Sequence, residues 1–504
     1  MNAAPAKATI RRLPSGVPGL DDVLGGGLPE YSFNVIAGPP GCGKTTLANQ
    51  IMFSLATPQR PAIYFTVLGE PPLKMLRYQQ QFDFFDPDRL NRTIHFISLG
   101  DEAASGDLGQ VLQRMVAEVD AKKPGLVFVD SFRSLATTGM DNPQPLRKLQ
   151  EFVQELGVLM TSWQATTFLV GEYPDNDNNP VFTVADGLIW LRQSEQRNSV
   201  VRKLEISKMR GQASMAGLHS FRIDSSGLRV FSQPPLDRPQ LMAAPEPSRP
   251  RVRLGVEGLD EMLGGGLPRG YSLLVAGPSG AGKSIMASAF LVEGAREGET
   301  GVLATFEQRP NRSRGRALAE LIAAGRVGVI DARAPGLSVD EISTLLVAEI
   351  RRLKATRVVI DSLSGFELAL APTFREDFRE SLSRMVLAMA GTGVTILMTS
   401  ELEDRFFDLR FSPYGTAFLT DAIIVQRYVE LDSRLLRVIA VAKVRDSAHS
   451  NELRLFHIDD GGIRLDGMLH QHEGLLGGRP SLRKRAPGEP IAASWGRAGS
   501  EGIP

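Results

Sequence analysis

Residues 33–46 read FNVIAGPPGCGKTT, and residues 272–285 read SLLVAGPSGAGKSI. In both stretches a short apolar run leads into the pattern G-x-x-x-x-G-K-[ST], and a helix-favouring segment follows. A strand, a glycine-rich loop and a helix in this order form a phosphate-binding loop, because the glycines let successive backbone N–H groups turn toward phosphate oxygens beside the positive end of the helix. The two stretches therefore predict two nucleotide-binding α/β domains.

The lysine and the hydroxyl residue of each loop have separate expected roles. Lys44 and Lys283 would contact the β- and γ-phosphates of ATP, while Thr45 and Ser284 would bind Mg²⁺. The residues expected to hold the nucleotide are Gly38, Pro39, Pro40, Gly41, Cys42, Gly43, Lys44, Thr45 and Thr46 in the first loop and Gly277, Pro278, Ser279, Gly280, Ala281, Gly282, Lys283, Ser284 and Ile285 in the second.

The sequence around the two loops belongs to a tandem repeat. Three landmarks recur at nearly one spacing, with separations of 239, 231 and 235 residues: Lys44 with Lys283, Asp130 with Asp361, and Lys208 with Lys443. Self-similarity at a fixed spacing indicates repeated structural units. We interpret the protein as a duplication of a domain of roughly 230 residues, within the usual range of domain sizes.

Within each repeat, short apolar runs alternate with helical patterns, which is typical of a parallel sheet with crossover helices. The runs are continuously apolar, as strands buried on both faces are. The expected strands are 33–37, 62–68, 94–97, 126–130, 166–170, 187–191 and 201–206 in the first repeat and 273–276, 301–305, 328–330, 358–361, 395–398, 422–426 and 436–442 in the second. The expected fold class is α/β, twice, each copy a mostly parallel sheet flanked by helices.

Composition divides the chain into five segments. Residues 233–250 carry six prolines and little apolar content, so they are expected to form a semi-extended linker. The last residues are rich in Gly, Pro and Arg without a period, which is typical of disorder. We expect a flexible N-terminus at 1–12, a first ATPase domain at 13–232, the linker at 233–250, a second ATPase domain at 251–470 and a disordered tail at 471–504.

Two strands end in aspartate. LVFVDS (126–131) and RVVIDS (357–362) each place a carboxylate at the carboxyl edge of the sheet, beside the phosphate loop, where Mg²⁺ or its water needs an anion. An aspartate after a strand is often only a turn residue, but its pairing with a phosphate loop favours function. The expected metal-binding set is Thr45, Ser284, Asp130 and Asp361.

Hydrolysis also needs a group that positions water. Glu307 ends the strand after the second phosphate-loop helix, where its carboxylate could face the γ-phosphate. Aligning Pro72 with Pro310 sets Gly69 opposite Glu307, so the first site keeps only Glu70, one position later. Two further strand-end carboxylates are weaker candidates for sensing the γ-phosphate, Glu172 and Glu401.

A basic pair follows a late strand of each repeat. Lys208-Met-Arg210 and Lys443-Val-Arg445 place both cations of a pair on one face of an extended strand. Basic residues on an edge strand also discourage edge-to-edge pairing. Their recurrence at matched positions favours a function near the nucleotide.

The composition excludes several classes of protein. Among 504 residues, 42% are hydrophobic and 23% charged, as in ordinary globular proteins, and the Lys+Arg and Asp+Glu counts are both 57, so no net charge draws the chain to nucleic acid or acidic lipid. The single cysteine rules out a disulfide framework and fits a reducing compartment. The first residues lack the apolar core of a signal peptide, and no run of 18 apolar residues occurs. We therefore expect a cytoplasmic enzyme, with neither a membrane nor nucleic acid as partner.

Together these motifs resemble the KaiC family of RecA-superfamily ATPases over about residues 13–465. The specific elements are the G-[VI]-x-G-[LF]-D…GGG segment before each phosphate loop, the duplicated domains, RVVIDSLS at 357–364 and the two K-x-R elements. The resemblance implies two tandem RecA-like P-loop NTPase domains in a double-ring homohexamer, with ATP and Mg²⁺ between neighbouring subunits. It further implies that the K-x-R residues act in trans, with KaiB-like or signalling proteins as partners.

The resemblance also implies slow ATP hydrolysis, mainly in the first ring, and Ser/Thr autokinase activity in the second. The chain departs from the family pattern at Gly69-Glu70, where two glutamates are usual, and in its tail, so a tail-binding partner is not carried over. At the two usual phosphoacceptor positions stand Ala417 and Phe418. We expect autophosphorylation to be weak or absent and confined to Thr416 or Thr420.

Two other functions remain open from the sequence. A RecA-like DNA recombination or helicase motor would need a basic stripe facing DNA, and none is found. An ATP-binding scaffold with negligible turnover would carry the same motifs as an active ATPase. Turnover measured beside nucleotide affinity separates the scaffold from the enzyme.

Overall fold

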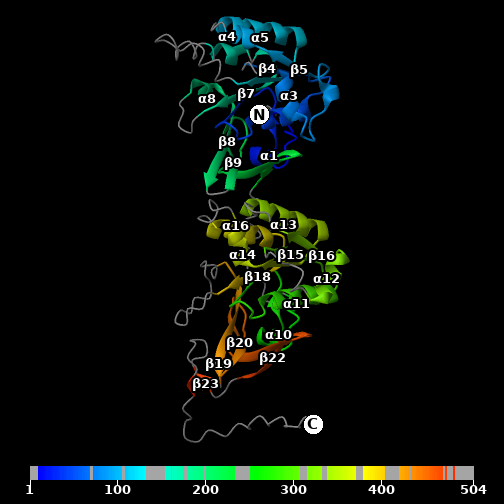
Figure 1. Cartoon of the computed structure of the whole chain (residues 1–504), viewed down its shortest axis with the longest axis vertical. Helices are drawn as coiled ribbons and strands as arrows, with labels where there is room; N and C mark the ends of the chain where they lie inside the picture. The colour runs from blue at the N-terminus through cyan, green and yellow to red at the C-terminus, as the bar shows by residue number, and fades with distance from the viewer. Residues whose placement is uncertain are drawn as a thin grey trace, which may run out of the picture. The chain divides into compact units, whose positions relative to one another are not determined.

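The computed structural model describes residues 10–67, 72–104, 108–131, 152, 154–159, 162–173, 179–196, 199–232, 250–306, 315–331, 338–370, 378–402, 419–431, 433–468, 472–473 and 481–482 (Figure 1). The chain divides into two compact units, one made of residues 1–238, 332–348 and 367–388 and the other of the remaining residues. None of the helices in the described ranges is long and apolar enough to cross a membrane.

The first repeat begins with a small β-ribbon and continues as alternating strands and helices. Its described helices are α1 (Leu20–Leu24), α2 (Lys44–Leu55), α3 (Pro72–Gln79), the 3-10 turn η1 (Pro87–Arg89), α4 (Gly100–Ala104), α5 (Leu108–Lys122) and α8 (Pro180–Val184). Its described strands are β1 (Arg12–Leu13), β2 (Leu28–Pro29), β3 (Phe33–Gly38), β4 (Ala62–Thr66), β5 (Ile94–Ser98), β6 (Leu126–Asp130), β7 (Thr166–Glu172), β8 (Gly187–Gln196), β9 (Ser199–Met209), β10 (His219–Asp224) and β11 (Gly227–Phe231).

The second repeat follows the same order. Its described helices are α10 (Leu259–Met262), α11 (Lys283–Arg296), α12 (Arg316–Ala323), α13 (Val339–Leu353), α14 (Leu363–Ala369) and α16 (Phe378–Ala390). Its described strands are β12 (Arg251–Val252), β13 (Leu267–Pro268), β14 (Ser272–Gly277), β15 (Gly301–Thr305), β16 (Val327–Asp331), β17 (Arg357–Asp361), β18 (Thr395–Glu401), β19 (Ala422–Leu431), β20 (Arg434–Val444), β21 (Leu453–Asp459) and β22 (Gly462–Met468), and the chain continues to β23 (His472–Glu473) and β24 (Ser481–Leu482).

Each repeat builds one large sheet. Among the described strands, nine join in the order β11-β10-β9-β8-β3-β7-β6-β4-β5, and nine join in the order β16-β15-β17-β18-β14-β19-β20-β21-β22. From β8 to β5, and from β16 to β19, all neighbours are parallel. The remaining pairs are antiparallel. The predicted fold class is confirmed, with two tandem RecA-like domains.

The core of the first repeat has two layers, one on each face of the sheet. Along the fully buried β3, Ile36 belongs to a core that includes apolar residues of α2, whereas Val35 and Ala37 belong to a second core that includes apolar residues of α5. This alternation follows from the two-residue period of a strand. Figure 1 shows α4 and α5 side by side above β4 and β5. Because β3 is central and α2 follows it, the first phosphate loop lies at the middle of the sheet's carboxyl edge.

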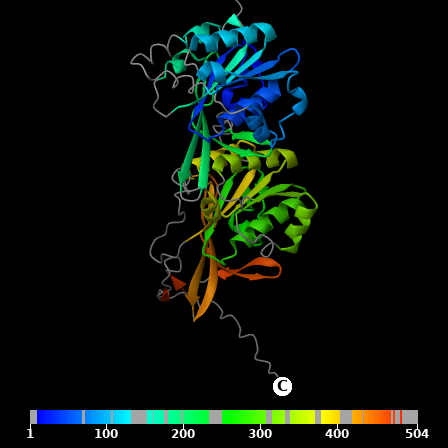
Figure 2. The same ribbon diagram turned by 45° about the horizontal axis from the view of Figure 1, so that its top comes forward.

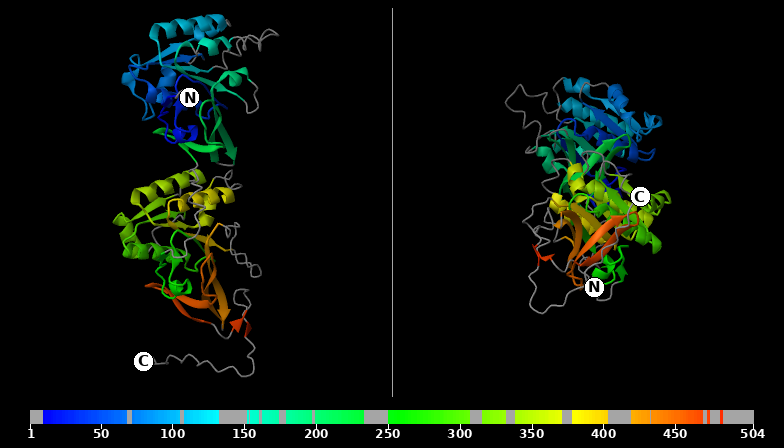
Figure 3. Two further views of the ribbon diagram at one scale, coloured as in Figure 1. Left: turned by 180° about the vertical axis from the view of Figure 1, so that it is seen from behind. Right: turned by 60° about the horizontal axis from the view of Figure 1, so that its bottom comes forward.

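The sequence analysis missed the last two strands of each sheet, β10 with β11 and β21 with β22. It also predicted the two strands before them, β8 with β9 and β19 with β20, to be shorter than they are. β8 and β9 pair from Gly187↔Met209 to Gln196↔Ser199, and Figure 2 shows them as a long green hairpin. The orange β19–β20 hairpin repeats this form in the second repeat (Figure 3).

Candidate functional site

Backbone geometry shapes both phosphate loops in the same way. Gly41 and Gly43 have φ angles of 73° and 106°, and Gly280 and Gly282 have φ angles of 75° and 99°. Glycine tolerates these left-handed values, whereas other residues rarely adopt them. Because α2 and α11 begin directly after Gly43 and Gly282, the N–H groups of each first helical turn face the loop, where they favour an anion.

The loop lysines fold back onto their own loops. Lys44 is 7% exposed, and its Nζ donates to the carbonyl oxygen of Pro39 at 2.8 Å. Lys283 Nζ donates to the carbonyl oxygens of Gly277 and Pro278 at 2.8 and 2.7 Å. These neutral acceptors keep each cation beside its loop, where charged phosphate oxygens would accept stronger hydrogen bonds.

The expected metal residues of the first repeat are in direct contact. Thr45 Oγ1 donates to Asp130 Oδ2 at 2.8 Å. Tyr64, which the sequence analysis did not single out, donates its hydroxyl to the same oxygen at 2.7 Å. Burial raises the pKa of Asp130, while these two hydrogen bonds and the charge of Lys44 act against that rise. The three hydrogen-bonded side chains come from α2, β6 and β4, so the sheet itself assembles the site.

This donor set fits Mg²⁺. No cluster of three or more His, Cys, Asp or Glu able to hold a metal occurs among the residues that the structure describes. Mg²⁺ does not need one, because it usually binds through one or two protein oxygens together with substrate phosphates and water. Thr45 with Asp130, and Ser284 with Asp361, would hold the ion, which when bound neutralises charge on the phosphate oxygens.

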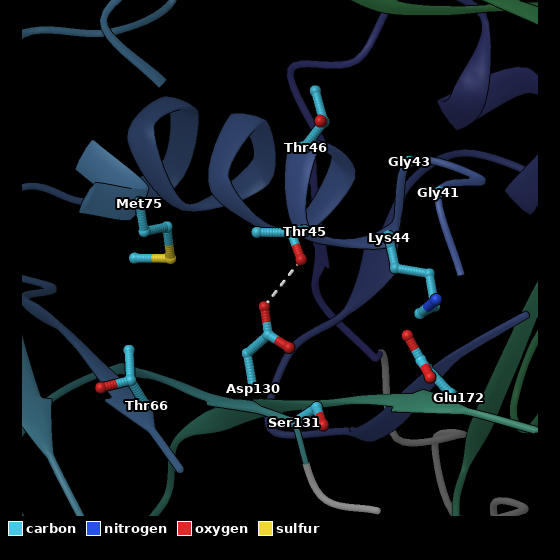
Figure 4. A pocket seen from close by; sticks show the side chains of 10 residues that line it. All are labelled: Gly41, Gly43, Lys44, Thr45, Thr46, Thr66, Met75, Asp130, Ser131 and Glu172. Carbon is cyan, nitrogen blue, oxygen red and sulfur yellow. Dashed lines mark hydrogen bonds between the residues drawn. The ribbon is translucent and has the colours of Figure 1, made fainter. Parts of the chain in front are cut away.

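A pocket of about 340 Å³ opens beside this pair, a volume typical of small-ligand sites. Figure 4 shows its lining residues, which come from the phosphate loop, α2, α3 and the carboxyl ends of β4, β6 and β7: Gly41, Gly43, Lys44, Thr45, Thr46, Thr66, Met75, Asp130, Ser131 and Glu172. Glu172 points toward Lys44 in this view. Of the two weaker acidic candidates, Glu172 therefore lies in the pocket, whereas Glu401 is an exposed residue at the end of β18.

The second repeat supports its aspartate with a different donor. Asp361 ends β17 as Asp130 ends β6. Thr399 Oγ1 donates to Asp361 Oδ1. Thr399 lies on β18, whereas Tyr64 lies on β4, the neighbour on the opposite side of the aspartate strand. The peptide bond after each aspartate is cis.

Strand register fixes which residues of the two repeats are equivalent. Thr66, at the end of β4, pairs with Asp130. Thr305, at the end of β15, pairs with Asp361. Thr66 and Thr305 are therefore equivalent residues.

This equivalence corrects the alignment made on prolines. Counting onward from the two threonines sets Leu68 opposite Glu307 and Gly69 opposite Gln308, so the proline alignment, which set Gly69 opposite Glu307, was wrong by one residue. Glu70 and Glu307 both lie outside the described residues. Their catalytic roles stay predictions.

The basic pair of the first repeat lies near the start of β8. Lys208 Nζ donates to the carbonyl oxygens of Phe182 and Thr183 at 3.2 and 3.1 Å. Arg210 pairs with Asp186 at 3.3 Å. Burial and the nearby charge of Arg210 lower the pKa of Lys208. Both cations are thus held at the amino edge of the parallel sheet, away from the phosphate loop.

The second repeat reproduces this arrangement. Lys443 Nζ donates to the carbonyl oxygen of Thr420 at 2.7 Å, and Arg445 pairs with Asp421 at 3.3 Å. Burial and the charge of Arg445 lower the pKa of Lys443. Matched contacts in both repeats indicate one conserved arrangement within the duplication.

A phosphate loop after the central strand, a helix that starts at the loop lysine and an aspartate at the end of a nearby strand define a P-loop ATPase domain, present here twice. The model of the KaiC ATPase family matches residues 13–235 and 252–468, and the chain belongs to this family.

Three curated relatives are similar over nearly the whole chain, each a circadian clock oscillator protein KaiC. That of Picosynechococcus sp. is 26% identical over 487 residues, covering 94% of this chain and 93% of the relative. That of Thermosynechococcus vestitus is 26% identical over 490 residues, with 94% and 93% covered. That of Prochlorococcus marinus is 26% identical over 486 residues, with 94% and 96% covered.

Proposed function

We propose that the protein is an oligomeric Mg-ATP hydrolase whose nucleotide sites are completed by neighbouring subunits, and that it works as a signalling or timing switch. Membership of the KaiC ATPase family supports ATP binding and hydrolysis. The proposal includes a homohexameric double ring, KaiB-like or other signalling proteins as partners, and a cytoplasmic location. The observation that carries it is the placement of the K-x-R residues away from their own phosphate loops.

Backbone hydrogen bonds measure this separation in the first repeat. Arg210 N donates to Asp186 O, and Asp186 N donates to Phe33 O, so Arg210 is level with the start of β3. The phosphate loop begins at Gly38, five residues further on, which is roughly 16 Å at the usual rise of a strand. That distance exceeds the length of an arginine side chain. Arg210 therefore does not reach its own phosphate loop, which supports the proposal that it serves a phosphate of another subunit, as heterologous contacts in a closed ring allow.

Each group in a shared site has a definable role. The loop lysine binds the β- and γ-phosphates, and the arginine and lysine of the neighbour offset the charge that develops during phosphoryl transfer. In the second site Glu307 would orient the attacking water. The first site carries Leu68 at the equivalent position, which leaves only Glu70 for that role. We therefore expect the second site to turn ATP over faster.

Autokinase activity, which the family resemblance implies for the second repeat, is expected to be weak or absent in this chain. Ala417 and Phe418, at the usual acceptor positions, and Thr416 lie outside the described residues. Thr420 is fully buried, and Lys443 binds its carbonyl oxygen. A hydroxyl must lie within about 3–3.5 Å of the γ-phosphorus for transfer, so a buried Thr420 is a poor acceptor. We propose water as the main phosphoryl acceptor.

Occupancy of the two sites tests the proposal. Lys44→Ala and Lys283→Ala should each remove about one ATP per subunit, because each deletes the point charge that binds the β- and γ-phosphates, and the double variant should bind almost none. Lys122→Ala in α5 is the control, since Lys122 pairs with Glu118 on a helix surface. Full occupancy in the double variant would contradict the site assignment. ATP bound without turnover would favour the scaffold, and a salt-dependent shift with DNA would favour the motor.

A further inference from the structure

Tyr64 is a buried tyrosine whose hydroxyl contacts Asp130, an expected metal-binding residue of the first site. It is completely inaccessible to solvent, and its ring stacks on Phe128 with centroids 5.9 Å apart and lies 5.2 Å from Phe96. Its hydroxyl donates to Asp130 Oδ2 at 2.7 Å. Neighbouring aromatic rings on β5 and β6 thus fix the ring, and the ring fixes the direction of the hydroxyl.

The second repeat has no hydroxyl at the corresponding place. Strand register, with the matched threonines, makes Leu303 the equivalent of Tyr64. Asp361 receives its hydrogen bond from Thr399 instead.

The equivalent of Thr399 in the first repeat is Val170, which is fully buried and pairs directly with Asp130 in the register of β6 and β7. The donor has therefore changed strands between the repeats. Where Tyr64 is present, Val170 takes the place of the threonine, and where Thr399 is present, Leu303 takes the place of the tyrosine. Each aspartate keeps one buried hydroxyl donor.

We propose that Tyr64 and Thr399 are positioning residues that orient Asp130 and Asp361 for Mg²⁺ at the two nucleotide sites. In the first site Thr45 and Tyr64 both donate to Oδ2, and within the described residues no hydrogen bond reaches Oδ1. In the second site Thr399 donates to Oδ1, and in the part of the chain that the structure describes no hydrogen bond to Oδ2 occurs. A carboxylate fixed through one oxygen presents the other in a constant direction, which is how groups behind a metal ligand improve affinity.

The inference rests on the proposed Mg-ATP sites and extends them, because it assigns a separate support to each. Tyr64→Phe keeps the ring and its stacking but deletes the donor, so Asp130 loses one of the two hydrogen bonds that fix it. Val170→Thr then offers a replacement, because a threonine has nearly the shape of valine and stands where Thr399 stands in the second repeat.

The test measures the metal directly by the electron paramagnetic resonance signal of free Mn²⁺, titrated into protein with a non-hydrolysable ATP analogue. In a Lys283→Ala background, which reports the first site, Tyr64→Phe should weaken Mn²⁺ binding by about 10-fold or more. Adding Val170→Thr should restore most of the affinity. Thr399→Val in the same background is the matched control and should leave the Mn²⁺ affinity of the first site unchanged, because Thr399 lies in the second repeat. In a Lys44→Ala background, which leaves only the second site to bind nucleotide, Thr399→Val should weaken Mn²⁺ binding at that site.

The outcomes are distinct. Unchanged Mn²⁺ affinity in Tyr64→Phe overturns the inference while leaving the nucleotide site intact. Weakening that Val170→Thr does not relieve also overturns it, because a merely structural loss would not depend on the donor. Absence of any analogue-dependent Mn²⁺ binding in the Lys283→Ala protein overturns both this inference and the proposed function. If Tyr64→Phe does not fold, Thr399→Val in the Lys44→Ala background decides, and unchanged affinity there counts against the proposal.

Discussion

Lys44 and Lys208 lie at opposite edges of one sheet. Lys44 follows the carboxyl end of β3 as the first residue of α2. Lys208 is in register with Leu188 near the amino end of β8, and its ammonium binds carbonyl groups that precede that strand. The loop lysine and the K-x-R lysine of one repeat therefore do not meet within it, which is why we propose sites shared between subunits.

Assembly should depend on the nucleotide. A ligand shared by two subunits binds only the assembled state and stabilises it selectively. With saturating Mg-ATP the mass in light scattering should be near that of six chains, and it should fall when nucleotide is removed or in Arg210→Ala/Arg445→Ala. A monomer at micromolar concentration with saturating Mg-ATP would falsify the ring.

The two sites should differ in chemistry. Glu307→Gln removes the water-positioning carboxylate but keeps the shape of the side chain, so turnover in a Lys44→Ala background should fall by about 100-fold, a typical contribution of general base catalysis. ATP binding should change little. The matched control is Glu307→Gln in a Lys283→Ala background, where only the first site works. Equal phosphate release with and without the substitution in the Lys44→Ala background would exclude the role of Glu307.

The sequence predicts the parts of the site that lie within one continuous motif. The phosphate loops and the strand-end aspartates are short patterns with a fixed chemical purpose, and each occurs twice in the duplicated sequence. Tyr64 and Thr399 escape such an analysis, because their importance comes from which strands neighbour Asp130 and Asp361 in the sheet, and sheet order is not written in any local pattern.

The composition of β10 and β11 explains why the sequence analysis missed these two strands. β10 and β11 are joined by the turn Ser225-Ser226 after Asp224, a short Asp/Ser/Gly turn of the kind that signals a hairpin. The strands themselves carry polar and charged residues, so a search for continuously apolar runs passed over them. The proline alignment failed because it used a loop as its anchor, whereas strand pairing fixes residue equivalence.

Autophosphorylation should be weak or absent. After incubation with labelled ATP, phosphopeptide mapping should find little phosphate on the residues between 412 and 420, since Ala417 lacks a hydroxyl and Thr420 is buried. Inorganic phosphate should account for nearly all ATP consumed. Stoichiometric phosphate on any residue of that segment would show that the second repeat is a working kinase.

A buried ion pair should make the second repeat sensitive to mutation and acid. The guanidinium of Arg357 is 1% exposed and pairs with Glu299 at 2.5 Å; the equivalent residue of the first repeat is Leu126. Glu297 also pairs with Arg357, at 2.7 Å. Glu299→Gln should lower the free energy of unfolding by about 2 kcal/mol, because it removes one of the two carboxylates that compensate the buried guanidinium. Glu320→Gln, in an exposed pair with Arg316, is the control and should change it by less than ~0.5 kcal/mol. Thermal unfolding measures both.

The pH dependence of this pair has a definite sign. Burial opposes ionisation of Glu299, but the hydrogen bonds and charges of Arg357 and Arg269 outweigh it and lower its pKa. A group with a lowered folded-state pKa stabilises the protein above its ordinary pKa, and that contribution is lost as the pH falls through the folded-state value. The difference in stability between wild type and Glu299→Gln should therefore shrink in acid.

Mixing two inactive variants tests the shared sites most directly. Lys44→Ala/Lys283→Ala lacks both phosphate-binding lysines but keeps both K-x-R pairs, and Arg210→Ala/Arg445→Ala has the opposite defect. In a random equimolar ring about one quarter of the interfaces would join an intact loop to an intact arginine, so the mixture should recover up to about one quarter of wild-type ATP hydrolysis. Mass measurement checks that rings containing both variants form. If they do, and the rate of ATP hydrolysis of the mixture only equals the sum of the rates of the separate variants, the sites are not shared between subunits.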